Sequence, residues 1–360
     1  MRRTILHSGL ILCILAINLI GCRNENQNKK NKKKTSVSLK VNAPSHSQQY
    51  TIGDQIKIDL SVENADNIKD LTIYFDDVIF KENIEVKSQV IIIETKDLPV
   101  GFSTIYITYN DKTGKPRAGT RNIILFSDLI PDQKIASVVK TYPHRNEAYT
   151  QGLEFYKGEL FESTGSGDYA KSFLAKVNLS TGQHIAYQEM ENKNYFGEGI
   201  TIINDTIYQL TWQDKQCLVY DLDFNYIKSF TYEGEGWGLT NNGKSLIMSN
   251  GSSSIVWRNR HTFEIEKTID VFSHEKDVQN LNELELINGD LWCNVYTTDY
   301  LVQVDTATGK VLANIDCSGI VRKGMIGNAN VLNGIAYEPN TQKLYLTGKL
   351  WSVLYEVKID

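Results

Sequence analysis

The sequence predicts an all-β protein in two parts, an immunoglobulin-like β-sandwich followed by a five-bladed β-propeller. Short runs of alternating apolar and polar residues fill positions 38–127. Beyond Ser127 a longer unit, built of several strands, repeats five times. The chain contains 19 Tyr, 12 Phe and 25 Gly but only 6 Pro, a mixture that favours strands and turns over helices.

The first 21 residues are predicted to be a targeting signal and not part of the fold. Two arginines precede an apolar run from Ile5 to Ile20, which is too short for a comfortable membrane span. The run ends in Leu-Ile-Gly-Cys22, which resembles a bacterial lipobox, so we expect Cys22 to be acylated and to become the mature N-terminus. An ordinary secretory signal is the alternative. Residues 22–36 are polar and lysine-rich, as in a flexible basic tether. We therefore expect a lipid-anchored protein of the bacterial cell envelope, on the periplasmic or surface side of a membrane.

The charge of the body excludes nucleic acid as a partner. Residues 35–360 carry 30 basic and 42 acidic residues, a net charge of −12. Phosphate contacts need clustered Lys and Arg, which a body this acidic lacks. Three cysteines, Cys217, Cys293 and Cys317, lie in strand-like apolar runs, where buried thiols are the ordinary explanation. One pair of them could form a disulfide, and the spacing does not indicate which pair.

Residues 37–128 are predicted to form the sandwich. Its strands are expected at 37–41, 56–62, 71–75, 90–93, 103–107 and 122–126, where apolar residues recur at short intervals. No cluster of His, Cys or paired carboxylates lies on these strands. We expect this part to be a spacer or a docking module.

Residues 132–360 are predicted to form the propeller. The second strand of each unit centres on an apolar or aromatic pair: Leu160-Phe161, Ile207-Tyr208, Leu246-Ile247, Leu291-Trp292 and Leu344-Tyr345. The spacings are close to the length of a four-stranded blade. The fifth unit supplies only three strands, and the run Ile135–Tyr142 has no partner in the first unit. We expect this run to complete the last blade and to close the ring.

Every unit is entered through Gly, Asn, Glu or aromatic residues in equivalent register. The segments are 149–153, 195–199, 233–239, 280–285 and 330–335. Glycines let backbones approach a common axis closely, and the amides and carboxylates offer polar groups there. The sequence thus predicts a ligand site where these segments converge.

Eight short strings, in this order, resemble the glutaminyl-peptide cyclotransferases of the plant and bacterial type. They are Tyr-Thr-Gln-Gly-Leu-Glu-Phe (149–155), Glu-Ser-Thr-Gly (162–165), Tyr-Phe-Gly-Glu-Gly (195–199), Gln-Leu-Thr-Trp (209–212), Glu-Gly-Glu-Gly-Trp-Gly-Leu (233–239), Asn-Leu-Asn-Glu-Leu-Glu (280–285), Leu-Asn-Gly-Ile-Ala-Tyr (332–337) and Thr-Gly-Lys-Leu-Trp (347–351). The resemblance implies an acyltransferase that converts the N-terminal glutamine of peptides or proteins to pyroglutamate and releases ammonia.

The resemblance also implies roles for individual residues. Glu198 matches the catalytic glutamate, expected to take a proton from the α-amine and to deliver it to the leaving ammonia. A carboxylate that only bonds loop backbone is the alternative, and Glu235 is a competing carboxylate that we rank as structural or supporting. The substrate-binding residues implied are Gln151, Asn282, Lys349, Trp212, Trp237, Tyr149, Phe196 and Tyr296. Without the resemblance the two amides would be assigned to turn capping, Lys349 to solvent and the aromatic residues to the core. Relatives commonly carry tryptophan at the position of Tyr296, so we expect an effect on substrate preference more than on activity.

No metal is predicted at the site, and no cofactor is expected to be required. His144, His184, His261 and His274 have no ligand spacing and are predicted to be solvated in loops. A structural cation on the propeller axis, held by backbone carbonyls, is implied by the resemblance alone. We expect a monomer. A catalytically silent propeller that binds a partner on its axis is the alternative function, and a lyase or hydrolase is a weaker third.

Overall fold

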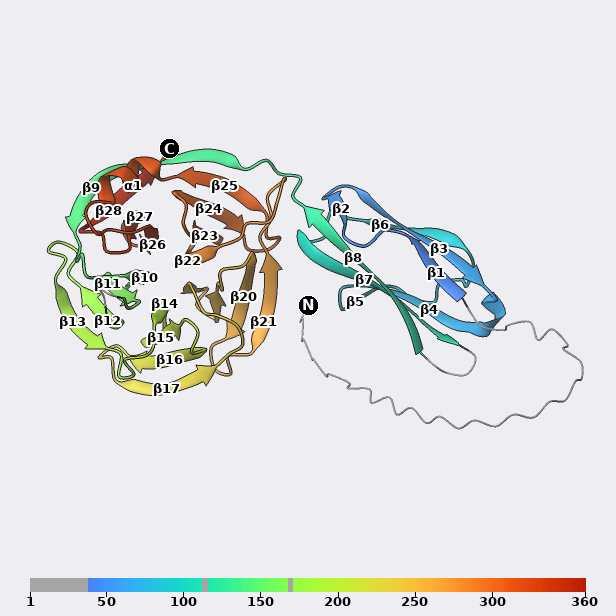
Figure 1. Cartoon of the computed structure of the whole chain (residues 1–360), viewed down its shortest axis with the longest axis horizontal. Coiled ribbons are helices and arrows are strands. Elements are labelled where there is room, and N and C mark those ends of the chain that lie inside the picture. The colour runs from blue at the N-terminus through green and yellow to red at the C-terminus, as the bar shows by residue number, and fades with distance from the viewer. Residues whose placement is uncertain (1–37, 112–115, 168–170) are drawn as a thin grey trace, which may run out of the picture. The chain divides into compact units, whose positions relative to one another are not determined.

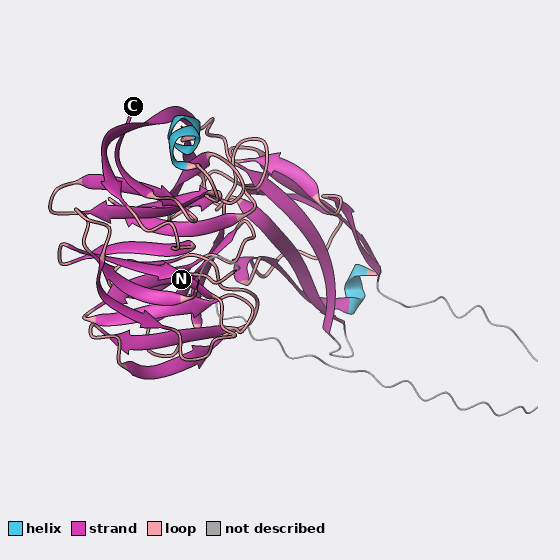
Figure 2. Ribbon diagram, turned by 60° about the vertical axis from the view of Figure 1, so that its left-hand side comes forward, coloured by secondary structure: helices cyan, strands magenta, loops and turns pink. Residues whose placement is uncertain are grey.

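The computed structural model describes residues 38–111, 116–167 and 171–360 (Figure 1). The predicted signal, the lipidation site Cys22 and nearly all of the tether lie outside the described residues. Strands dominate the described part, which contains one α-helix and one short 3-10 helix (Figure 2). The prediction of an all-β protein is confirmed. No helix within the described ranges is long and apolar enough to cross a membrane.

The chain divides into two compact units, the first made of residues up to 48, 55–93 and 103–123 and the second of 49–54, 94–102 and 124–360. The strands up to residue 126 form two sheets. One has the order β1 (Ser38–Ala43), β3 (Gln55–Glu63), β6 (Gln89–Glu94), and the other β2 (Gln48–Thr51), β8 (Pro116–Phe126), β7 (Gly101–Asp111), β4 (Ile68–Phe75), β5 (Val78–Lys81). The 3-10 helix η1 (Ala65–Asn67) precedes β4.

The apolar residues of the predicted alternating runs form the core of the first unit. Ile58, Ile73, Ile105 and Ile107 are fully buried. Side chains of a strand alternate between its two faces, so every second residue of these strands packs inward. The six predicted runs coincide with β1, β3, β4, β6, β7 and β8. Strands β2 and β5, of four residues each, were not predicted.

The second unit consists mainly of antiparallel sheets, and in three of them the strands follow one another along the chain. Three sheets have four strands each: β10 (Thr150–Tyr156), β11 (Glu159–Thr164), β12 (Phe173–Val177), β13 (His184–Glu189); β14 (Gly197–Ile203), β15 (Thr206–Thr211), β16 (Gln216–Asp221), β17 (Tyr226–Thr231); and β18 (Leu239–Asn241), β19 (Ser245–Met248), β20 (Ser254–Asn259), β21 (Ile265–Asp270). An eight-stranded sheet has the order β22 (Leu281–Ile287), β23 (Asp290–Val295), β24 (Tyr300–Asp305), β25 (Val311–Asp316), β9 (Asp132–Pro143), β28 (Val353–Ile359), β27 (Lys343–Gly348), β26 (Leu332–Glu338). Helix α1 (Ser318–Gly324) lies against β9.

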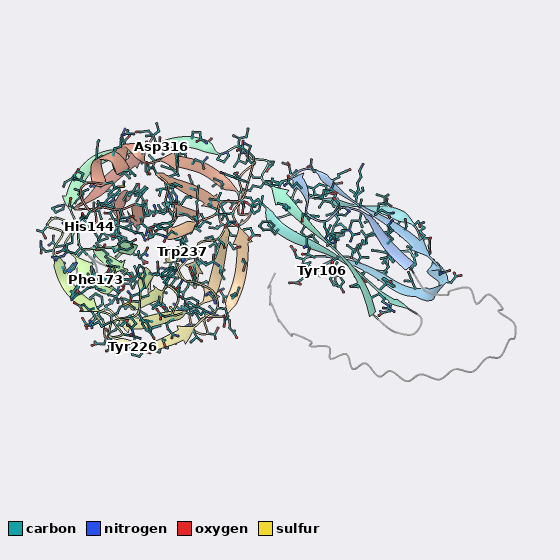
Figure 3. All side chains as sticks on the ribbon, viewed as in Figure 1. Tyr106, His144, Phe173, Tyr226, Trp237 and Asp316 are labelled. Atoms are coloured by element: carbon teal, nitrogen blue, oxygen red, sulfur yellow. The ribbon has the colours of Figure 1, made fainter. Side chains whose placement is uncertain are left out.

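The sheets of this unit surround a common centre (Figure 1). Strand β10 contacts β14, β14 contacts β18, β18 contacts β22, β22 contacts β26, and β26 contacts β10 again. These innermost strands are almost entirely buried, whereas the outermost strands β13 and β17 are mostly exposed. Figure 3 accordingly shows Trp237 toward the centre and Tyr226 at the periphery.

Strand β9 joins the beginning of the unit to its end. Its first residues pair in parallel with β25, from Asp132 opposite Ala313. Its remaining residues pair antiparallel with β28, from Ala136 opposite Ile359 to Pro143 opposite Val353. The expectation that the run Ile135–Tyr142 pairs with the last strand of the chain is confirmed.

Buried carboxyl groups tie neighbouring innermost strands together. The Glu283 side chain of β22 accepts hydrogen bonds from Leu153 N of β10 at 3.3 Å and from Ile335 N of β26 at 2.7 Å. Glu154 accepts one from Ile202 N of β14 at 3.2 Å. A buried backbone N–H without an acceptor is costly, so these side chains satisfy groups that the ladders leave unpaired. Burial raises the pKa of Glu154 to about 8 and that of Glu283 well above its usual range.

One histidine is buried, against expectation. His144 Nε2 lies 3.0 Å from Glu162 Oε1, and its Nδ1 lies 2.8 Å from Trp351 O. Carbonyl and carboxylate oxygens only accept hydrogen bonds, so these two partners favour the ring with protons on both nitrogens. The prediction that His144 is solvated is therefore wrong. Cys217, Cys293 and Cys317 are buried free thiols, as their apolar runs indicated.

Candidate active site

Four of the innermost strands begin with a β-bulge that carries polar side chains. The register shifts lie between Thr150 and Gly152 in β10, Gly197 and Ile200 in β14, Leu281 and Leu284 in β22, and Leu332 and Ile335 in β26. Gln151, Glu198, Asn282 and Asn333 occupy these shifts. A bulge turns a side chain out of the regular alternation of a strand and is common beside active sites. Equivalent bulges thus bring four polar residues from separate strands to one region.

Glycines at this level let the innermost strands approach one another. A Cβ atom on Gly199 would lie 2.4 Å from Leu239 N, and one on Gly238 would lie 2.0 Å from Asn282 O. These separations are shorter than any real Cβ contact, so the backbones meet this closely only because the residues are glycine. The close approach gives the side chains of adjacent strands access to one cavity.

All nine predicted catalytic and substrate-binding residues line a single cavity of about 200 Å³. They are Tyr149, Gln151, Phe196, Glu198, Trp212, Trp237, Asn282, Tyr296 and Lys349. The polar members are buried, and the five aromatic members are half-buried. The cavity therefore has a floor of buried polar side chains and a rim of aromatic side chains. The aromatic residues are therefore not core residues, although the sequence pattern alone would have assigned them to the core.

Hydrogen bonds through Gln151 connect Lys349 with Glu198. Lys349 Nζ donates to Gln151 Oε1, and Gln151 Nε2 donates to Glu198 Oε1 at 3.0 Å. Asn333 Nδ2 also donates to Gln151 Oε1, at 3.1 Å. Because two donors occupy Oε1, the amide orientation of Gln151 is determined, and its N–H faces Glu198.

Glu198 is a buried carboxyl group with an unused oxygen. Its side chain is 3% exposed, and burial raises its pKa well above 4.5. Lys349 opposes this rise in pKa, and Glu235 adds to it. Within the described part of the chain, neither Glu198 Oε2 nor Asn282 Oδ1 has a hydrogen-bond partner. A buried oxygen without a partner costs about 1–3 kcal/mol, so both atoms favour a ligand that donates hydrogen bonds.

Lys349 is a buried cation between two tyrosine rings. It is 1% exposed, and its Nζ lies 4.6 Å from the Tyr149 ring centroid and 5.0 Å from that of Tyr296. Burial lowers its pKa to about 8, although Glu198 opposes the fall. The alternative of a solvated lysine is wrong. An ammonium has three protons, so Lys349 can donate to a ligand while it holds Gln151.

The aromatic rim is a series of ring-to-ring contacts. The ring centroids are 6.1 Å apart for Tyr149 and Phe196, 5.7 Å for Phe196 and Trp212, and 5.6 Å for Trp237 and Tyr296. The Tyr149 hydroxyl is hydrogen-bonded to Tyr296, so the hydroxyl that tyrosine adds at position 296 has a partner. Burial and this bond raise the pKa of Tyr149 to about 12, so the Tyr149 hydroxyl stays protonated near neutrality.

Sequence analysis did not assign Asn333, Ser163 or Gln209 to the site. Asn333 holds Gln151, and its place in a bulge equivalent to that of Gln151 was the signal that could have revealed it. Ser163 Oγ donates to Glu198 O at 2.5 Å and accepts from Gln209 Nε2 at 2.9 Å. These two side chains fix the backbone of Glu198 from behind, a role without a local sequence signal.

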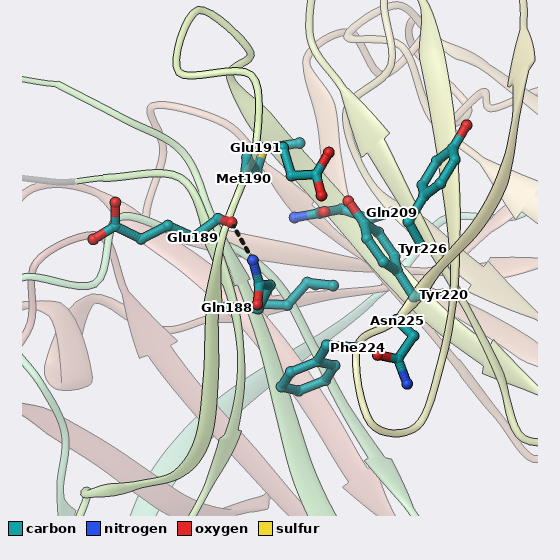
Figure 4. Close-up of a pocket in the computed structure, with 10 residues that line it drawn as sticks. Gln188, Glu189, Met190, Glu191, Gln209, Tyr220, Phe224, Asn225 and Tyr226 are labelled. Carbon is teal, nitrogen blue, oxygen red and sulfur yellow. Dashed lines mark hydrogen bonds between the residues drawn. The ribbon is translucent and has the colours of Figure 1, made fainter.

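A second cavity, of about 390 Å³, lies beside the outer strands β13 and β17 (Figure 4). Its lining includes Gln188, Met190, Gln209, Tyr220 and Tyr226, and no predicted site residue. Gln188 Nε2 donates there to Glu189 O at 3.0 Å. The smaller cavity is the better candidate because it combines a buried carboxyl, a buried ammonium and aromatic walls.

Comparison with known proteins agrees with this geometry. Residues 124–359 match the sequence model of the family described as glutamine cyclotransferase. The chain belongs to the glutamine cyclotransferase family. The resemblance carried by the eight short strings is confirmed.

Two relatives of the family illustrate the similarity. A glutaminyl-peptide cyclotransferase of Arabidopsis thaliana is 38% identical over 230 residues, which are 62% of this chain and 70% of the relative. The crystal structure of Myxococcus xanthus glutaminyl cyclase aligns with a TM-score of 0.60 and 32% identity, over 64% of this chain and 98% of that one. Both sequence identities, 38% and 32%, are higher than a shared fold by itself would require.

Proposed function

We propose that this chain is a glutaminyl-peptide cyclotransferase in which Glu198 is the general acid and base. The observation that carries this proposal is the buried carboxyl of Glu198, bonded to Gln151 and facing the same cavity as Lys349. Family membership supplies the reaction, and the cavity supplies groups that this reaction needs. The product is a peptide with N-terminal pyroglutamate, and ammonia is released.

The reaction requires one proton to be taken from the attacking nitrogen and given to the leaving nitrogen, which a single carboxyl group with a raised pKa can do. The α-amine of the substrate must lose a proton to attack the side-chain carbonyl carbon of the same glutamine. A new C–N bond closes the five-membered ring, the bond to the amide nitrogen breaks, and that nitrogen leaves as ammonia with the proton returned by Glu198. A peptide α-amine has a pKa of about 8, so a fraction of the substrate is already neutral near neutrality. Burial raises the pKa of Glu198 well above its ordinary value, so its carboxylate accepts a proton from the attacking nitrogen more readily than an ordinary glutamate would.

The remaining side chains have complementary roles. Lys349 donates to the oxygen that becomes negative as the ring closes, from a site with little water. Asn282 Oδ1 accepts a hydrogen bond from the amine or the amide of the substrate. The rings of Trp212 and Trp237 pack against the apolar stem of the glutamine and hold it in the ring-closing conformation. Because the rim is half-exposed, the rest of the peptide extends into solvent.

The finer architecture is part of the same proposal. We interpret the second unit as a five-bladed propeller over residues 132–360, in which β9 joins the fourth and fifth blades into the eight-stranded sheet. The cyclic contacts of the innermost strands support this interpretation. Residues 37–128 would form the immunoglobulin-like sandwich, after a signal of residues 1–21 and a tether of residues 22–36. A lipidated Cys22 at the cell envelope and a monomeric state remain predictions.

The expected axial cation also remains a prediction. Among the described residues, no group of three or more His, Cys, Asp or Glu side chains could hold a metal ion. Side chains there do not offer such a site, and a cation would rely on backbone carbonyls. No step of the proposed reaction depends on it.

Ammonia release from a Gln-Ala peptide tests the proposal. We expect release by the full-length protein and a loss of at least about a hundredfold in kcat for Glu198→Gln, which keeps the shape of the side chain but cannot move a proton. An unaltered protein that releases no ammonia and forms no pyroglutamate would favour the catalytically silent binding module. Full activity of Glu198→Gln would remove only the role of Glu198.

A further inference from the structure

A second carboxylate lies behind the aromatic rim and contacts both tryptophans. Trp212 Nε1 donates to Glu235 Oε2 at 2.7 Å, and Trp237 Nε1 donates to the same oxygen at 2.9 Å. Gln213 Nε2 donates to the other oxygen, Oε1, at 3.1 Å. Bonds from N–H donors to an ionised acceptor are about twice as strong as those between neutral groups. Glu235 thereby joins two rings that come from different loops.

With Glu235 the rim becomes a closed collar. Ring contacts run from Tyr149 through Phe196 to Trp212, and separately from Trp237 to Tyr296. Lys349 Nζ joins the tyrosine ends, and Glu235 joins the tryptophan ends. The collar thus has five rings and two charged joints of opposite sign.

The loop that carries Glu235 is anchored to the same structure. Gly236 N donates to Trp212 O at 3.3 Å, and a Cβ on Gly236 would lie 2.2 Å from the Tyr232 hydroxyl oxygen. Burial alone would raise the pKa of Glu235, but the bonds from Trp237, Gln213 and Trp212 outweigh burial and lower it. Glu235 is therefore ionised near neutrality.

We propose that Glu235 is a positioning residue of the cyclotransferase site, which fixes the two tryptophan rings around the substrate and adds a negative charge that acts on Glu198. The inference rests on the proposed function. Glu235 would thus determine both the positions of the tryptophan rings in the rim and part of the electrostatic potential at Glu198. The ionisable groups that interact with Glu198 are Lys349, Glu235, Tyr149 and Tyr232, and only Glu235 adds a second negative charge near neutrality.

Two substitutions separate these effects. Glu235→Ala removes both the acceptor and the charge, whereas Glu235→Gln keeps an acceptor oxygen for the indoles and removes the charge. We expect Glu235→Ala to raise KM about tenfold, since it deletes two charge-assisted bonds, and Glu235→Gln to change KM by no more than about twofold. Without the negative charge, Glu198 ionises more easily, so both variants should move the acid limb of kcat/KM to lower pH by about half a unit. A purely structural side chain would leave this limb in place.

A spectroscopic measurement tests positioning without reference to activity. The chain has five tryptophans, and an indole N–H bonded to a carboxylate resonates downfield of a solvated one. In the full-length protein we expect two downfield indole signals that Glu235→Ala shifts together. Glu233→Gln is the matched control, because Glu233 lies two residues away with a side chain 97% exposed, and it should leave KM, the pH limb and the indole signals unchanged.

The outcomes are distinct. Fewer than two displaced indole signals in Glu235→Ala would overturn the positioning role, and an unmoved acid limb in both variants would overturn the electrostatic role. If the unaltered protein released no ammonia, the proposed function would fail, yet the indole signals would still decide whether Glu235 fixes the rings.

Discussion

Lys349 owes its chemistry to burial between aromatic faces. The rings of Tyr149 and Tyr296 stabilise the cation, while the loss of hydration destabilises it, and the balance lowers its pKa to about 8. An ordinary lysine would stay charged far above the pH at which a peptide α-amine becomes neutral. In this protein the charge of Lys349, the proposed oxyanion donor, is lost as the pH rises through about 8.

We therefore expect an alkaline limb near pH 8 in the pH dependence of kcat. Above this pH Lys349 loses the proton that stabilises the oxyanion, so the rate should fall. Lys349→Met should lower kcat by about a hundredfold or more and abolish this limb. Pyroglutamate formation measured from pH 6 to pH 10, with Lys140→Met as a surface control, checks the expectation. An unchanged limb in Lys349→Met would assign it to another group.

His144 and Glu162 form a buried ion pair, with His144 Nε2 3.0 Å from Glu162 Oε1. Burial acts against the charge of His144, but the adjacent Glu162 and the bond to Trp351 O outweigh it, and the pKa of His144 is raised above 6.5. The unfolded chain binds this proton less tightly. The resulting stabilisation is complete below about pH 6.5 and is lost as the pH rises through the folded-state value.

The pair should make stability depend on pH in a way that His144→Gln removes. At pH 6 the substitution should cost about 3 kcal/mol of unfolding free energy, because Glu162 loses its partner, and the cost should shrink toward pH 9. Urea unfolding of both proteins at the two pH values measures this. The buried Glu154, Glu283 and Glu285 also destabilise the fold as pH rises, but they are present in both proteins and cancel. A cost that does not depend on pH would contradict the assignment.

At the scale of elements, the same device recurs in four of the five innermost strands, β10, β14, β22 and β26. A bulge at its entry turns a polar side chain toward the cavity, and a neighbouring glycine lets the adjacent strand come close. The remaining residues of these strands stay in regular antiparallel pairing and supply the buried apolar faces between sheets. The polar residues of the cavity and the apolar residues of the core thus occupy different parts of the same strands.

Gly238→Ala tests the close approach. The added methyl group would meet Asn282 O at 2.0 Å, which forces β18 and β22 apart. We expect a destabilisation of about 1–3 kcal/mol and a fall in kcat/KM of at least about tenfold, because Asn282 and Trp237 move with the backbone. Gly319→Ala in helix α1 is the control, since the nearest side-chain atom to the added methyl group would be Arg322 Nη2 at 4.0 Å. Equal effects of the two substitutions on unfolding and kinetics would contradict the argument.

At the scale of the whole molecule, charge is distributed unevenly along the chain. The first 34 residues are strongly basic, whereas residues 35–360 carry a net charge of −12. The substrate arrives with a cationic N-terminus, so an acidic body increases its local concentration at low salt. This attraction is screened when the Debye length becomes shorter than the protein.

Raised salt should therefore raise KM with little change in kcat. Between about 0.05 and 0.5 M NaCl we expect an increase of a few fold for a Gln peptide that carries lysine further along. A peptide of equal length with glutamate in place of lysine should show a smaller or opposite trend. The same KM for both peptides at all salt concentrations would remove the role of net charge.

The sequence by itself determined the strands, their grouping and the candidate residues. Alternation marked the strands up to residue 126, five apolar pairs marked β11, β15, β19, β23 and β27, and the unpaired run Ile135–Tyr142 indicated the partner of β28. These features depend on residues close together in the chain, whose periodicity and turn chemistry survive in any context. The nine residues that line the cavity were indicated by the resemblance of the eight short strings to a known family, and not by periodicity or spacing alone.

Only the tertiary structure decided the pKa values of the site side chains, which residues support them and how they are oriented. The hydrogen bond from Lys349 to Gln151 joins residues 198 positions apart, and the bond between Gln151 and Glu198 spans 47. The burial of His144, the support from Asn333 and the bridge made by Glu235 likewise depend on which strands become neighbours. A pKa or a hydrogen bond reflects everything within a few ångströms, most of which comes from distant parts of the chain. The sequence specifies which chemical groups are available, and the fold specifies which of them come into contact in a buried site.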